Sequence, residues 1–231
     1  MRAYGWVAGC LSSNRPGAGN KRARFEIVTP IHLQGYLKPE QVERLIDAAP
    51  NLRDKLLVRI PWRTGVRVSE LVGIRVQDID FKGRAILIKT QKTRKRNGRT
   101  IKRRRLVPID QGTLDMVREY LEWRKQFPYT GKLLFPITRQ RVDQIFWKLG
   151  KRVGIKEIGA PAVSKHRKLH PDHLRHLFAI HCVRKGMSVE RLQEILGHQS
   201  PKSTTPYLQF LAAALHADYD KVWEEDETTE G

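Results

Sequence analysis

The chain has 231 residues, enough for one sizeable domain, and a formal net charge of +20. This charge favours a polyanionic partner, most simply a nucleic acid, although a ribosome-type RNA binder or a merely basic chain would share it. No apolar run approaches the roughly 20 residues of a membrane span, and two cysteines without a CxxC motif cannot form a disulfide framework, so we expect a cytoplasmic protein.

The charge is distributed unevenly along the chain. Residues 82–105 contain 12 Lys or Arg and no acid, whereas residues 216–231 contain 7 acids and one Lys. Subtracting the tail's net charge of −6 from +20 leaves +26 for residues 1–215. We therefore predict three parts: a loosely organised arm over residues 1–36, a folded domain over residues 37–215 and a separate acidic tail over residues 216–231.

The folded part opens with helical patterns. From Pro39 onward, apolar residues recur at positions 42, 45, 46 and 49, which is the spacing of one helix face. Two more apolar segments, 56–62 and 68–71, are separated by a break at Thr64-Gly65. The glycine can end one helix and let the next begin, so we expect helices on both sides of this break.

A strand pattern follows. Ala85–Ile88 and Leu106–Ile109 have the composition of short strands, and Asn97-Gly98 marks a turn between them. Because a proline cannot donate to a ladder, Pro108 restricts the second strand to an edge or places the proline at the strand's end. The pattern predicts a β-hairpin with a long, basic, exposed loop.

Helical patterns return in the second half. Apolar stripes at 114–121 and 142–153 predict two helices. His173–Lys185 and Ser188–Leu196 predict two more, joined at Gly186 and closed by Gly197, and Tyr207–His216 also has a helical pattern. The expected fold is therefore α+β: a mostly helical domain with a small antiparallel sheet.

Four motifs carry side chains suited to phosphoryl transfer. Arg67 lies in Thr-Gly-Val-Arg-Val-Ser-Glu-Leu, Arg175 in Leu-Arg-His, His198 in Leu-Gly-His, and Tyr207 follows Thr-Thr-Pro. Arginine offers a planar, charged fork for phosphate oxygens. Histidine can donate a hydrogen bond to developing charge, and tyrosine can be the covalent nucleophile.

In this order and spacing, the motifs resemble the tyrosine recombinase (phage integrase) family over roughly Leu37–Tyr207. The resemblance implies that double-stranded DNA is broken and rejoined through a 3′-phosphotyrosine, without a metal or another cofactor. It also implies a homo-oligomer of four protomers on two duplexes, with accessory DNA-binding proteins as further candidate partners. The family's helical core-binding domain usually precedes the catalytic domain, and the 36 residues before Leu37 are too few for it.

The resemblance also assigns roles to residues. Arg67 and Arg175 would bind the scissile phosphate, His198 would donate to it, Tyr207 would attack it, and Glu70 would support the arginine and histidine. The lysine that protonates the leaving 5′-oxygen matches Lys92, with Lys89 and Lys95 as alternatives. The basic stretch would bind DNA phosphates through Lys89, Arg94, Lys95, Arg96, Arg99, Lys102, Arg103 and Arg104.

One position departs from the family pattern. The family usually has a histidine three residues before the second arginine, where this chain has Asp172. A carboxylate beside a phosphate is unfavourable, so we expect Asp172 to support a helix N-terminus and His173 to take the family role. We expect His176 and Cys182 to be packing residues on a buried helix face.

Two other functions fit part of the pattern. The helix–Gly–helix arrangement over 173–196 also resembles a helix-turn-helix, so the chain could be a DNA-binding regulator without catalysis. A strand-nicking relaxer of the topoisomerase IB type would use a similar set of residues without partner exchange. A covalent protein–DNA adduct on a nicked substrate would separate the enzymes from the regulator.

Overall fold

The structure is a computed structural model, and it describes residues 37–90, 94–96, 99–101, 103–128, 131–155, 168–198 and 207. The arm over residues 1–36 and the acidic tail over residues 216–231 lie outside these residues. So does the expected helix over 207–216, apart from Tyr207 itself. Among the described helices, none is long and apolar enough to cross a membrane.

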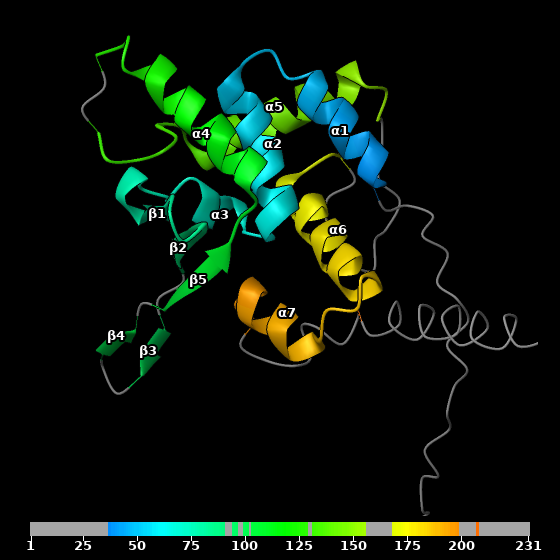
Figure 1. Ribbon diagram of the computed structural model, residues 1–231. Coiled ribbons are helices and arrows are strands. Elements are labelled where there is room, and N and C mark those ends of the chain that lie inside the picture. Colours follow the sequence, from blue (N-terminus) through cyan, green and yellow to red (C-terminus); the bar gives the residue numbers. More distant parts are fainter. Residues whose placement is uncertain are drawn as a thin grey trace, which may run out of the picture.

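Helix α2 (Leu52–Thr64) lies at the centre of the helical body (Figure 1). It packs against α1 (Pro39–Asp47), α4 (Gln111–Arg124), α5 (Arg139–Arg152) and α6 (Pro171–Arg184). Apolar side chains around much of its circumference are buried, which is the pattern of a core helix rather than a surface one. The Asn51 side chain accepts the backbone N–H of Asp54 at 2.9 Å and so caps its first turn.

A three-stranded antiparallel sheet lies beside the helices in the order β1 (Ile79–Asp80), β2 (Ala85–Lys89), β5 (Arg104–Pro108). Pro108 ends an edge strand, as its missing N–H predicts. Strand β1 was not expected, and β5 begins two residues earlier than the pattern indicated. The prediction of a mostly helical fold with a small antiparallel sheet is confirmed.

The basic stretch between β2 and β5 contains a second hairpin. Strands β3 (Arg94–Arg96) and β4 (Arg99–Ile101) pair with each other and with no strand of the first sheet among the described residues. The hairpin extends away from the helical body (Figure 1). Its predicted turn residues, Asn97 and Gly98, lie outside the described part.

Two left-handed glycines end helices at one place in the fold. Gly65 (φ +63°) ends α2 before the short α3 (Val68–Leu71), and Gly197 (φ +65°) ends α7 (Val189–Leu196). Both conformations favour glycine because it has no Cβ. The breaks predicted at Gly65 and Gly197 are thus confirmed, and α6 begins two residues before the expected start. The remaining element is a 3₁₀ turn, η1 (Val76–Asp78).

Candidate active site

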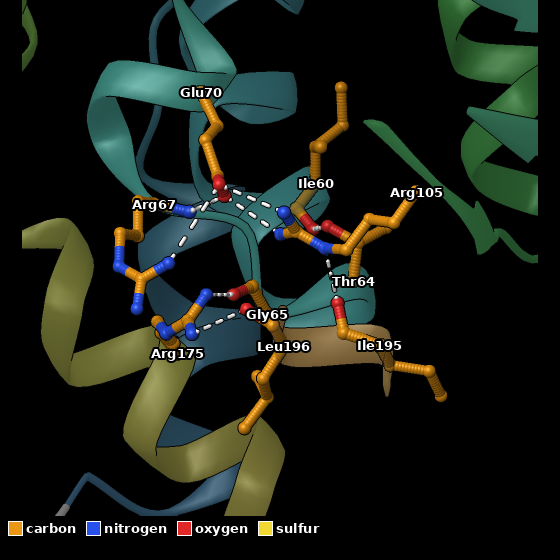
Figure 2. Close-up of polar contacts among 9 residues, drawn as sticks. All are labelled: Ile60, Thr64, Gly65, Arg67, Glu70, Arg105, Arg175, Ile195 and Leu196. Atoms are coloured by element: carbon orange, nitrogen blue, oxygen red, sulfur yellow. Dashed lines mark hydrogen bonds and ion pairs between the residues drawn. The ribbon is translucent and has the colours of Figure 1, made fainter. Parts of the chain in front are cut away.

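The carboxylate of Glu70 organises one side of the site. The backbone N–H of Arg67 donates to Glu70 Oε2 at 3.0 Å, and Arg105 donates to both carboxylate oxygens at 2.9 and 2.8 Å. Figure 2 shows this carboxylate between the two arginines. Burial alone would raise the pKa of Glu70, but the hydrogen bonds and charge of Arg105 lower it below its usual value, so Glu70 stays anionic.

Arg105 connects three elements, and the sequence reasoning did not select it. It lies on β5, pairs with Glu70 of α3, and donates through Nε to the carbonyl oxygen of Ile195 at 2.6 Å. Its partners are 35 and 90 residues away along the chain. Within a run of similar cations no local pattern distinguishes Arg105, so only its tertiary contacts reveal its place.

Arg175 is buried where two helices end. Its Nη1 donates to the carbonyl of Gly65 at 2.5 Å, and its Nη2 donates to the carbonyl of Leu196 at 2.7 Å (Figure 2). The last carbonyls of α2 and α7 lack helical partners and carry partial negative charge, so they suit a cation. They fix the guanidinium while leaving other N–H groups of the fork for a further acceptor.

The site is strongly electropositive. Burial, and then repulsion by Arg67, lowers the pKa of Arg175 to about 9, which still leaves it charged at neutral pH. Three guanidinium groups, those of Arg67, Arg105 and Arg175, accompany the single carboxylate of Glu70. The three positive charges and one negative charge give a net charge of about +2 in a partly buried site, which favours the binding of an anion.

His198 follows the glycine that ends α7 and is half-buried. Burial and then the nearby charges of Arg175, Arg67 and Arg105 lower its pKa to about 3, so the imidazole is neutral at physiological pH. It can therefore donate one hydrogen bond without carrying charge. His198 also lines a pocket of about 360 Å³ together with Thr90, Arg103, Arg104, Arg105, Glu190, Gln193, Glu194 and Gly197.

Tyr207 is buried, and its hydroxyl meets His176. The distance from Tyr207 Oη to His176 Nδ1 is 2.5 Å. Tyr207 also lies close enough to Arg175 to interact with its charge. The expectation that His176 is only a packing residue was therefore wrong: it is half-buried and contacts the candidate nucleophile. Cys182 is buried as expected, and burial raises the pKa of its thiol to about 11.

Asp172, which stands where the family usually has a histidine, and its neighbour His173 make contacts within the first turn of α6. Asp172 lies in the first turn, where its backbone N–H donates to His170 Nδ1 at 3.1 Å and its carboxylate lies 3.6 Å from the same nitrogen. His173 is buried, and its Nδ1 lies 3.1 Å from both the backbone N and the backbone O of His170. Asp172 thus occupies the expected helix N-terminus, and the Nδ1 of His173 lies against the backbone of that same turn.

The predicted DNA-binding cations divide into three groups. Lys89 pairs through Nζ with Asp78 Oδ1 at 2.5 Å, and Asp78 is buried. Arg103 and Arg104 line the pocket beside His198. Lys102 lies outside the described residues, as does Lys92, the predicted general acid, and only the backbone is described for Arg94, Lys95, Arg96 and Arg99.

Comparisons with known proteins agree on one family. Residues 35–213 match the phage integrase family. The chain is 32% identical over 189 residues to the tyrosine recombinase XerA of Pyrococcus furiosus, covering 80% of this chain and 61% of that protein. It is 31% identical over 208 residues to the tyrosine recombinase XerD of Corynebacterium glutamicum, covering 83% and 61%. The chain thus spans about three-fifths of the length of these relatives.

Solved structures share the fold. A crystal structure of XerA recombinase superposes with a TM-score of 0.65 at 27% identity, covering 80% of this chain and 64% of that chain. The catalytic domain of bacteriophage HP1 integrase superposes with a TM-score of 0.55 at 24% identity, covering 80% and 93%. XerH recombinase bound to its difH substrate superposes with a TM-score of 0.61 at 21% identity, covering 83% and 54%.

Proposed function

Because the chain belongs to the phage integrase family, we propose that it is a site-specific DNA recombinase that cleaves and rejoins strands through a 3′-phosphotyrosine. One observation carries the proposal: Arg67, Arg175 and His198 lie together at an electropositive site, and Tyr207 lies beside Arg175. The chemistry of such a site matches an anionic phosphodiester and a tyrosine nucleophile.

The arrangement suits an in-line displacement. Tyr207 Oη attacks phosphorus, the new P–O bond forms, and the bond to the 5′-oxygen breaks. Arg67 and Arg175 bind the non-bridging oxygens, whose charge grows in the transition state, and neutral His198 donates a further hydrogen bond. Loss of one such donor typically costs roughly 2.7–4 kcal/mol of transition-state stabilisation. Bond energy is retained in the phosphotyrosine, so a free 5′-hydroxyl can reverse the step.

The leaving 5′-oxygen needs a proton, and a lysine of the basic stretch would supply it. We retain Lys92 in this role. The ammonium of Lys89 is held by Asp78 at 2.5 Å, which commits that lysine to a buried carboxylate and weakens it as a proton donor. Lys95 remains the alternative, because β3 carries it on the projecting hairpin.

Double-stranded DNA is the proposed substrate, held by the basic hairpin and by Arg103 and Arg104 beside His198. Four protomers on two duplexes would exchange strands. Accessory DNA-binding proteins would assist them, and the complex would be associated with DNA in the cytoplasm.

A helix-turn-helix regulator is less well supported. Helix α7 would be its recognition helix, yet its exposed charges, Glu190, Arg191 and Glu194, sum to −1, which does not favour phosphates.

Trapping on suicide DNA tests the proposal. A nicked duplex that loses a short fragment after cleavage should leave the wild-type chain covalently attached to DNA. Tyr207→Phe removes only the nucleophilic oxygen, so the adduct should vanish while DNA binding, measured by fluorescence anisotropy, persists. Mapping the modified residue by mass spectrometry should identify Tyr207. An adduct formed by the Phe variant would place the nucleophile elsewhere.

Partner exchange separates a recombinase from a strand-nicking relaxer. The same wild-type chain is incubated with a supercoiled plasmid that carries two copies of the target site. Recombination should give rearranged DNA circles, whereas relaxation without any rearrangement would favour the topoisomerase-like alternative.

A further inference from the structure

We propose that His176 is the general base that accepts the hydroxyl proton of Tyr207 during cleavage, a role that rests on the proposed function. The contact is direct, because His176 Nδ1 lies 2.5 Å from Tyr207 Oη. The two rings are tilted, with centroids 6.0 Å apart and planes at 41°, so the contact runs through the nitrogen and the hydroxyl rather than face to face.

The need for a base follows from the nucleophile. A free phenol has a pKa near 10, so almost none of it is ionised at neutral pH. The charge of Arg175 favours the phenolate but cannot receive a proton, since a guanidinium is already fully protonated. An imidazole with an unprotonated nitrogen at hydrogen-bond distance is the group that meets this need.

The other titratable side chains of the site have contacts at the start of α6 or an electrostatic setting that disfavours proton uptake. The carboxylate of Asp172 lies by His170 Nδ1, and the Nδ1 of His173 lies against the backbone of His170. His198 lies among three guanidinium groups, and burial with their charge lowers its pKa to about 3. This setting favours His198 as a hydrogen-bond donor.

The proposed step balances its protons. Neutral His176 carries its hydrogen on Nε2 and accepts the Tyr207 proton at Nδ1 as Oη bonds to phosphorus. The P–O5′ bond breaks, and the leaving oxygen takes its proton from the general-acid lysine. In the reverse step the 5′-hydroxyl attacks and gives its proton back to the lysine, the P–Oη bond breaks, and His176 returns its proton to Oη. The side chain thus ends each cycle in its starting form.

Single-turnover cleavage of suicide DNA by the full chain tests this role. His176→Ala should cleave about 10²-fold more slowly or worse, the usual contribution of a general base. Added imidazole should restore part of the rate, and substituted imidazoles should rescue in proportion to their basicity. His176→Asn keeps a hydrogen-bonding atom near the Nδ1 position but cannot take the proton, so it should remain slow.

Three controls separate a base from a structural role. His181→Ala removes another histidine from α6 and should cleave like the wild type. Circular dichroism and DNA affinity should be unchanged in His176→Ala. A 5′-bridging sulfur substrate, whose leaving group needs no proton, should restore Lys92→Ala but leave His176→Ala slow.

The contrary outcomes are distinct. Wild-type rates in His176→Ala or His176→Asn, or a defect that imidazole does not relieve, would overturn the role of His176 while the wild-type adduct at Tyr207 still supports the recombinase. Absence of any wild-type adduct would overturn both the proposed function and this inference.

Discussion

His198 lies among three guanidinium groups, and this environment couples its protonation to the stability of the fold. Its folded-state pKa of about 3 is far below the ordinary value of 6.5. Between these values the unfolded chain binds a proton that the folded chain rejects. The free energy of unfolding therefore has its full value above pH 6.5 and falls progressively as the pH drops towards 3.

Urea unfolding at several pH values checks this expectation. The wild type should lose more stability between pH 7 and pH 5 than His198→Gln, which cannot take up the proton. His181→Gln is the comparison: burial, and then the charges of Lys185, Arg63 and Arg184, lower the pKa of His181 at a place away from Arg67, Arg105 and Arg175. Parallel curves for the wild type and His198→Gln would show that His198 is not held neutral by its surroundings.

The residues of the site differ in how far the sequence could predict them. Arg67, Arg175, His198 and Tyr207 each lie in a recognisable local motif, and the structure brings them together. Arg105 and His176 could not be selected in this way. The first depends on partners 35 and 90 residues away, and the second on a tyrosine 31 residues away. Such roles are created by tertiary contacts that no local spacing records.

At the scale of elements, the end of α2 controls the placement of Arg175. A Cβ on Gly65 would lie 2.5 Å from Phe178 Cδ1 and 2.7 Å from Leu196 Cδ2, and the backbone is left-handed there (φ +63°). Gly65→Ala should therefore lose stability through both backbone strain and crowding. It should also slow cleavage, because the Gly65 carbonyl that holds Arg175 must shift.

Gly186→Ala is a close control for this change. Gly186 has a similar left-handed conformation (φ +81°), but a Cβ there would meet no atom within 4 Å. The Gly186→Ala variant should lose only the stability that a left-handed backbone costs an alanine, about 1–2 kcal/mol, and it should retain cleavage. Denaturant unfolding and single-turnover cleavage of both variants measure the difference. Equal losses of stability and rate in the two variants would show that the α2 end does not position Arg175.

Most helices could be predicted because their apolar spacing extends over two or more turns, and caps such as Gly65 and Gly197 mark their ends. The short strands were harder. Strand β1 has two residues, which is too few for an alternating pattern. Strand β3 consists of three cations and β4 has three residues with one cation, and the two pair through backbone hydrogen bonds that side-chain composition does not encode.

Across the whole molecule, the basic hairpin and the active site are separate positive surfaces. The hairpin of β3 and β4 extends away from the helical body (Figure 1). Arg67 and Arg175 belong to that body, the first at the start of α3 and the second on α6. A DNA duplex is long enough to meet both surfaces at once, because it carries charge along its entire length. The hairpin should therefore supply affinity without sequence information, and Arg67 and Arg175 should act on one phosphate.

Salt titration of DNA binding separates these contributions. Each neutralised phosphate contributes about 0.9 to the slope of log K against log salt. Replacing Arg94, Lys95 and Arg96 with Ala should flatten that slope by up to about 2.7 and weaken binding on every DNA sequence equally. The matched control removes three exposed cations of α5, namely Arg139, Arg141 and Lys148. Helix α5 lies in the upper part of the helical body, away from the hairpin (Figure 1). The control should keep the wild-type slope.

Equal flattening by both triple variants would mean that DNA binding depends only on the net charge of the protein. An unchanged slope in the hairpin variant would mean that β3 does not contact the DNA.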